Sequence, residues 1–88
     1  MKKSFTDAVS EKIAVPQETI SQLPLIELHG KRCVCIENHC GIMEYTQEQV
    51  RVAVRRGTVA VIGSRLEISR MTKRIVEIRG SVQRVELE

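Results

Sequence analysis

Hydrophobic and polar residues alternate along most of the chain after Pro24. The clearest example places Val50, Val52 and Val54 at every second position, with Arg51 and other polar or small residues between them. Successive side chains of a β-strand point to opposite faces of a sheet, so this spacing predicts a strand with one buried face and one solvated face. We expect the three valines to face a core.

Several further runs show the same character, and glycines separate some of them. The expected strands are Leu25–His29, Arg32–Glu37, Gly41–Thr46, Gln49–Arg55, Thr58–Ile62, Arg65–Ser69, Arg74–Arg79 and Val82–Glu88. Gly30, Gly57, Gly63 and Gly80 stand between runs, where we expect turns, because glycine adopts positive φ at no steric cost. This pattern predicts an all-β fold, a small antiparallel β-sandwich of seven to eight short strands.

In the N-terminal part of the chain, before Pro16, the apolar residues recur with a different period. Apolar residues recur there at helical spacing, namely Phe5, Ala8, Val9 and Ile13. Pro16 would end such a helix, because proline lacks the backbone donor and its ring clashes with the preceding turn. We therefore expect residues 1–23 to form a helical or extended N-terminal segment with a short helix, and residues 24–88 to form the β domain.

Composition narrows the class of protein. A chain of 88 residues has room for one domain, and Phe5 and Tyr45 are its aromatic residues, so valine, isoleucine and leucine must fill the core. No apolar run reaches the roughly 18 residues of a membrane span, and the N-terminus lacks the apolar centre of a signal peptide. Three cysteines without a C-x-x-C pair do not make a disulfide framework. We expect free thiols and a cytoplasmic protein.

Basic residues concentrate in the second half of the chain. The formal net charge is +3, and residues 45–88 carry nine basic and five acidic side chains. Arg51, Arg55 and Arg56 are the expected basic face, which makes nucleic-acid binding an alternative function. Single-strand binders also stack bases on aromatic side chains, and this half offers Tyr45 alone. Nucleic acid is therefore a disfavoured partner.

One group of side chains has the chemistry of a metal site. Its members are Cys33, Cys35, His39 and Cys40, with His29 nearby. Thiolate and imidazole suit tetrahedral zinc, but C-x-C is not the usual spacing of a zinc knuckle. Catalysis by the adjacent His39 and Cys40 is also disfavoured, because neighbours in an extended chain point in opposite directions. We expect no catalytic residue, no metal and no cofactor, with a small zinc-binding protein as a further alternative.

The stretch from Ile36 to Thr46 is the candidate binding site. Its polar residues would form an exposed patch on a connection held by rigid strands. They are Glu37, Asn38, His39, Glu44 and Tyr45. A purely structural reading also fits, in which the Asn38 side-chain oxygen captures a backbone N–H and Gly41 supplies a conformation that other residues resist.

The same stretch carries a family resemblance. The string E-N-H-x-G-I-x-E-Y-T, from Glu37 to Thr46, resembles the signature of the YabP/YqfC family of small sporulation proteins, and the YqfC-like branch in particular. Weaker similarity continues through residues 57–68 and 75–80. The resemblance implies a β-sandwich made in the mother cell during endospore formation, with no recognised enzymatic activity and with a membrane-associated sporulation protein as a partner. In that family a basic residue is more common at the position of Cys40.

We therefore expect a non-catalytic sporulation protein that acts as an interaction or assembly module in the mother-cell cytoplasm. Its partners would be its own copies, a membrane-associated sporulation protein, or both. The final run, Val82–Glu88, is the expected exposed edge, because an open strand can pair with a partner's strand through backbone hydrogen bonds.

Overall fold

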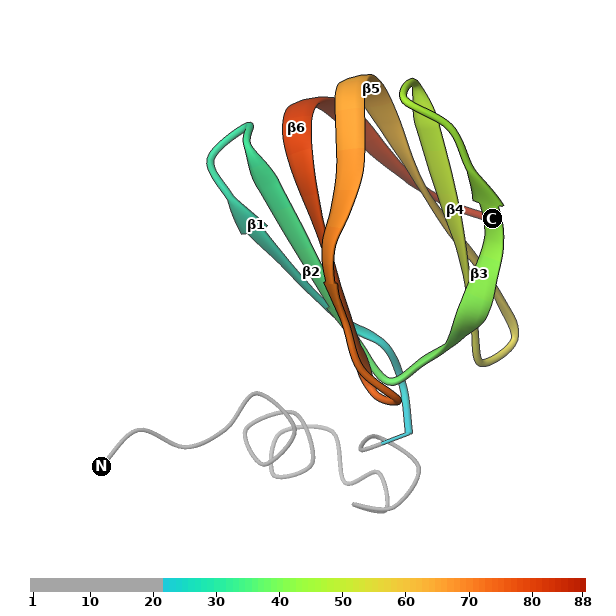
Figure 1. Cartoon of the computed structure of the whole chain (residues 1–88). Coiled ribbons are helices and arrows are strands. Elements are labelled where there is room, and N and C mark those ends of the chain that lie inside the picture. The colour runs from blue at the N-terminus through green and yellow to red at the C-terminus, as the bar shows by residue number, and fades with distance from the viewer. Residues whose placement is uncertain (1–21) are drawn as a thin grey trace, which may run out of the picture.

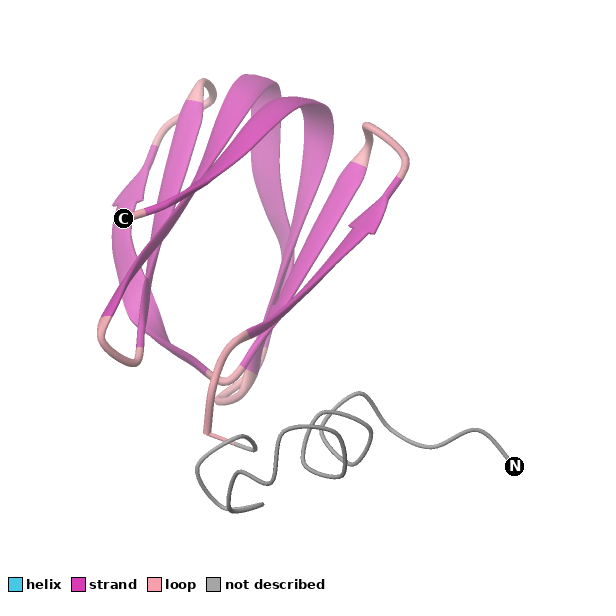
Figure 2. Cartoon of the chain, turned by 180° about the vertical axis from the view of Figure 1, so that it is seen from behind, coloured by secondary structure: helices cyan, strands magenta, loops and turns pink. Residues whose placement is uncertain are grey.

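The computed structural model describes residues 22–88, which form one antiparallel sheet of six strands (Figures 1 and 2). The strands are β1 (Leu25–His29), β2 (Cys33–Glu37), β3 (His39–Tyr45), β4 (Gln49–Val54), β5 (Gly57–Met71) and β6 (Ile75–Leu87). Their order across the sheet is β1-β2-β6-β5-β4-β3. The expected N-terminal helix lies outside the described residues. Within residues 22–88, no helix is long and apolar enough to cross a membrane.

The all-β, antiparallel prediction is confirmed, but the expected number of strands was wrong. The runs Thr58–Ile62 and Arg65–Ser69 are two halves of β5, and the last two predicted runs are two halves of β6. Gly63 and Gly80 therefore lie within strands and not in turns. The described chain is one six-stranded sheet and not a sandwich of seven to eight strands.

Bulges bend β5 and β6 where these glycines lie. The pairing register shifts between Ile62 and Gly63 and again between Ser64 and Glu67. Gly80 has φ +146°, and a Cβ there would lie 2.6 Å from the Arg65 carbonyl oxygen. A bulge adds an unpaired residue to one strand and increases its bend. Glycine is needed here because the two backbones approach too closely for a side chain.

Because of the bend, the two long strands of the β5–β6 hairpin pair with different neighbouring strands. The first half of β5 pairs with β4, whereas the first half of β6 pairs with β2. Figure 1 shows β5 and β6 curving over at the top of the view, so that the two ends of the sheet turn toward each other.

The curled sheet encloses a core made almost wholly of aliphatic side chains. Its buried members are Val34, Ile36, Val50, Val52, Val59, Val61, Leu66, Val76, Ile78 and Val82. Val50 and Val52 are fully buried, and Val54 is partly buried and packed against the cluster, so the predicted inward face of this strand is confirmed. Strands β2 and β4, which do not pair, thus share one core.

We expect Gly63→Ala to destabilise the protein by about 1–3 kcal/mol, because the new methyl group would overlap the Ser81 carbonyl oxygen. Urea unfolding followed by circular dichroism measures this change. The matched control is Ser64→Ala, at the next, exposed position, which should change stability by less than about 0.5 kcal/mol. Equal stability of the two variants would contradict the close approach.

Candidate functional site

The predicted binding stretch, Ile36–Thr46, contains the end of β2, a one-residue turn at Asn38 and all of β3. Asn38 has φ +64°, a conformation that asparagine tolerates better than most residues. Its backbone N–H donates to the Arg74 carbonyl at 2.7 Å, and its side-chain amide nitrogen donates to the Leu23 carbonyl at 3.0 Å. Its side-chain oxygen, which we expected to capture a backbone N–H, accepts a hydrogen bond from the Arg74 guanidinium at 3.5 Å. Asn38 thus ties the turn to two other segments of the chain.

His39 joins the start of β3 to the turn that follows β5. Its Nδ1 accepts a hydrogen bond from the Gly41 N–H at 3.0 Å, and its Nε2 lies 2.8 Å from the Thr72 carbonyl oxygen. Because Nδ1 is the acceptor, Nε2 must carry the proton and donate it. Gly41 has φ +124°, in agreement with the unusual conformation expected there. Both ring nitrogens of His39 are therefore engaged within the chain.

Tyr45 makes a second link, from β3 to β5 itself. Its hydroxyl oxygen accepts a hydrogen bond from the Ile68 N–H at 3.0 Å, while half of the residue remains exposed. Strand β4 lies between β3 and β5 in the sheet order. After the bend, however, the second half of β5 leaves β4 and meets β3. Tyr45 fastens the edge strand β3 to this half of β5, and His39 fastens it to the turn that follows.

Basic side chains surround the connection. A hollow beside it is lined by Gln22, Asn38, His39, Cys40, Arg55, Lys73 and Arg74. Arg74 lies 3.5 Å from the Glu37 carboxylate, and Glu44 is exposed at the register position opposite Arg51. The hollow thus brings predicted binding residues next to cations from two other turns.

The structure places the three arginines of the expected basic face in different settings. Arg51 forms an ion pair with Glu88 at 2.8 Å, Arg55 lines the hollow, and Arg56 occupies the β4–β5 turn with φ +65°. A second hollow, at the bend of the long hairpin, is lined by Lys31, Arg32, Arg65, Arg79, Gly80 and Ser81. The sequence did not identify this group, because it depends on how β5 and β6 bend.

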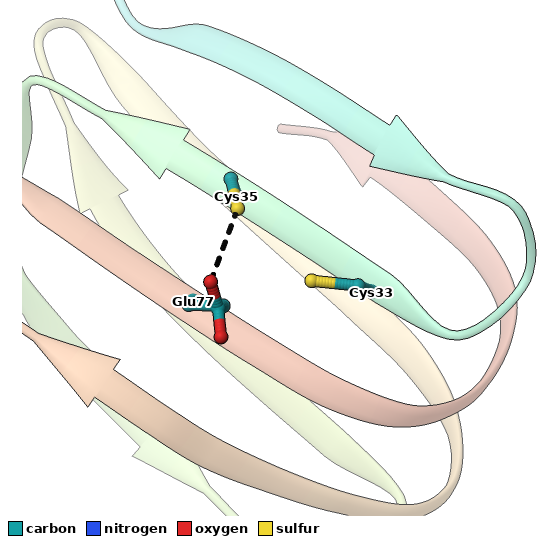
Figure 3. Close-up of side chains that lie close together, drawn as sticks. All are labelled: Cys33, Cys35 and Glu77. Atoms are coloured by element: carbon teal, nitrogen blue, oxygen red, sulfur yellow. Dashed lines mark hydrogen bonds between the residues drawn. The ribbon is translucent and has the colours of Figure 1, made fainter.

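The cysteine and histidine group predicted from the sequence is divided by the fold. Cys33, Cys35 and Glu77 project from the neighbouring strands β2 and β6, and their ligand atoms lie within 4.8 Å of one another (Figure 3). His39 and Cys40 belong to β3, at the far edge of the sheet. Glu77 had not been identified as a site residue. Strand alternation does place it on one face, but the β2–β6 register that brings it opposite Cys35 cannot be read from the sequence.

Hydrogen bonds and burial set the charge of this group. Ser69 Oγ donates to Glu77 Oε1 at 2.8 Å and Arg79 Nε donates to the same oxygen at 2.9 Å, which lowers the pKa of Glu77. Burial, together with the nearby Cys33 and Glu77, raises the pKa of the Cys35 thiol to about 11. At neutral pH the Cys35 thiol is therefore protonated, and it donates to Glu77 Oε2 at 3.8 Å.

Comparison with known proteins identifies the family of this chain. Residues 22–88, which include the whole described sheet, match the model of the YabP family. The chain belongs to the YabP family. Over 74 residues it is 22% identical to the uncharacterized protein YqfC of Bacillus subtilis (strain 168), covering 84% of this chain and 80% of that protein. No solved structure matches. The predicted family is thus confirmed, and in this YabP-family chain the Glu37–Thr46 stretch contains the end of β2, the turn at Asn38 and all of β3.

The two links to β5 should each contribute to stability. We expect Tyr45→Phe and His39→Ala each to cost about 1 kcal/mol, because each removes the partner of a backbone group on or just after β5. Urea unfolding measures the cost, and Glu44→Gln, on the same strand and exposed, is the control. Unchanged stability in both test variants would show that β3 is held without these bonds.

Alkylation should distinguish the thiols of this YabP-family protein. With its pKa raised to about 11, Cys35 holds about a hundredfold less thiolate at pH 8 than a thiol of pKa 9.0. We expect iodoacetamide to modify the exposed Cys40 first, and the rate at Cys35 to rise with pH up to about 11. Mass spectrometry of the peptides reports both rates, and unfolding in urea should abolish the difference. Equal rates at pH 8 in the folded protein would contradict the raised pKa.

Proposed function

We propose that this protein is a non-catalytic interaction module of sporulation, and that it docks through the open backbone edge of the second half of β6. Membership of the YabP family suggests a sporulation-related protein and supports the biological setting. The open edge supports the mode of docking. Strand addition at such an edge gains affinity from backbone hydrogen bonds and specificity from alternate side chains.

The second half of β6 has a neighbour on one side. Strand β2 pairs with β6 from Ile75 to Arg79. Beyond this, the Val82 N–H donates a hydrogen bond to the Lys31 carbonyl in the β1–β2 turn. Beyond that point, within the described residues, Arg84–Leu87 register with β5 alone. The expected edge at Val82–Glu88 is therefore open along most of its length, although β6 as a whole lies inside the sheet.

The direction of its backbone groups follows from the pairing with β5. Thr58 and Glu88 exchange both of their backbone hydrogen bonds, so they form a hydrogen-bonded pair. Such pairs alternate with non-bonded pairs along an antiparallel ladder. Val85 and Leu87, opposite Val61 and Val59, fall in the non-bonded class. Their N–H and C=O groups point away from β5, toward the open side.

The side chains of this edge suit pairing with a second copy. In an antiparallel pair with its two-fold axis at Val85, Arg84 of each copy lies opposite Glu86 of the other. Leu87, which is 75% exposed, would then gain a neighbouring strand. Self-association through this edge is the form that we propose. A membrane-associated sporulation protein with an extended segment would use the same backbone groups, and it is the second partner that we propose.

The charges of Arg84 and Glu86 allow a sharp test. We expect the wild type to show dimers in sedimentation velocity as its concentration rises. Arg84→Glu alone and Glu86→Arg alone should each weaken dimerisation, because like charges would then face each other. An equimolar mixture of the two variants should restore association as heterodimers, since each Glu would again lie opposite an Arg.

The mixture also separates the interface from folding. Within each chain, Arg84 Nε lies 2.6 Å from Glu86 Oε1, and both single variants lose this contact, whether or not they are mixed. Recovery on mixing therefore reports on contacts between chains. A monomeric wild type at all concentrations would refute self-association, and dimers unaffected by either charge reversal would place the interface elsewhere.

A further inference from the structure

Two thiols and a carboxylate converge on the outer face of β2 and β6, opposite to the aliphatic core. Cys33 and Cys35 are two residues apart on one strand and so share a face, and Glu77 is the register partner of Cys35. Their Sγ and carboxylate oxygen atoms lie within 4.8 Å of one another, and Figure 3 shows the three side chains turned toward one another. Cys33 is 7% exposed, so one side of the group is shielded from water.

The spacing suits a tetrahedral ion. Zinc binds thiolate at about 2.3 Å and carboxylate oxygen at about 2.0 Å, so a sulfur and an oxygen on one tetrahedral zinc lie about 3.5 Å apart. Cys35 Sγ and Glu77 Oε2 are 3.8 Å apart. A shift of a few tenths of an ångström would bring the pair to that separation. Two thiolates favour zinc over magnesium or calcium, which prefer oxygen ligands.

The carboxylate of Glu77 is already oriented for such a role. Ser69 and Arg79 both donate to Oε1, while Oε2 faces Cys35. Partners that fix the orientation of a ligand from behind are a regular feature of metal sites. Glu77 can therefore offer Oε2 to an ion while it keeps its hydrogen bonds from Ser69 and Arg79 at Oε1.

A fourth ligand is available on β1. His29 is the register partner of Cys33, so its side chain projects from the same face of the sheet. Its imidazole is largely exposed, with Nε2 3.7 Å from the Glu27 carboxylate. An exposed side chain reorients at low cost, and imidazole is a common ligand of zinc.

We propose that Cys33, Cys35 and Glu77 bind one Zn²⁺ per chain, with His29 as the fourth ligand. Both thiols bind as thiolates, and their two protons pass to solvent when the ion enters. The site joins β1, β2 and β6, so bound zinc would stabilise the β1 end of the sheet.

The test uses the full chain, freed of metal with a chelator. Equilibrium dialysis against Zn²⁺ should give about one ion per chain. Co²⁺ in place of zinc should give the intense visible bands of tetrahedral coordination together with thiolate-to-cobalt charge-transfer absorption. Cys33→Ser, Cys35→Ser and Glu77→Gln should each weaken zinc binding at least about tenfold, and His29→Ala should weaken it by a smaller factor.

Cys40→Ser is the matched control, because this exposed thiol lies on β3, away from the site. It should leave both the stoichiometry and the cobalt spectrum unchanged. Circular dichroism of each metal-free variant checks folding, and the near-isosteric Glu77→Gln carries the test if a serine variant fails to fold. Zinc binding that survives all of the site variants, or that is lost with Cys40→Ser, would overturn the proposal. An octahedral cobalt spectrum without charge-transfer bands would do the same.

Discussion

The close approach of two backbones at the bend of the β5–β6 hairpin determines the rest of the structure. At Gly80 the Arg65 carbonyl leaves no space for a Cβ, and at Gly63 the Ser81 carbonyl has the same effect. A flat sheet of six strands with one apolar face would expose that face to water. Because the hairpin bends, the β2 and β4 halves of the sheet cover one another, and an aliphatic core forms in a chain with almost no aromatic residues.

The bend has a cost elsewhere, since each long strand separates from one of its neighbours there. The second half of β5 separates from β4, and β3 is held to it by Tyr45 and to the turn after it by His39. The second half of β6 separates from β2 and gains no equivalent partner among the described residues. The same bend thus explains why β3 is fastened and why the second half of β6 has an open edge.

The sequence predicted features that depend on a single strand, but it did not predict features that depend on the alignment of two strands. Alternation identified β1 to its exact bounds and predicted the burial of Val50 and Val52. It misplaced Gly63 and Gly80, because a glycine required by a neighbouring backbone looks the same in sequence as one required by a turn. Glu77 was missed for a related reason: its partners Cys35 and Ser69 are 42 and 8 residues away, and strand order and register alone bring them together.

The side chains along the open edge of β6 determine how readily it pairs with another strand. Exposed strand edges are usually blunted by charge, proline or a covering element. Here the outward side chains Arg84 and Glu86 are paired with each other, so their charges largely cancel. A second strand that approaches the backbone groups of Val85 and Leu87 therefore meets no net charge repulsion. An edge protected by repulsion would carry like charges, and one protected by shape would carry proline or a further bulge. The edge of β6 instead carries Arg84 and Glu86, two charges of opposite sign. An antiparallel copy of the same strand places each Arg84 opposite a Glu86, so it is the approaching strand that this edge repels least.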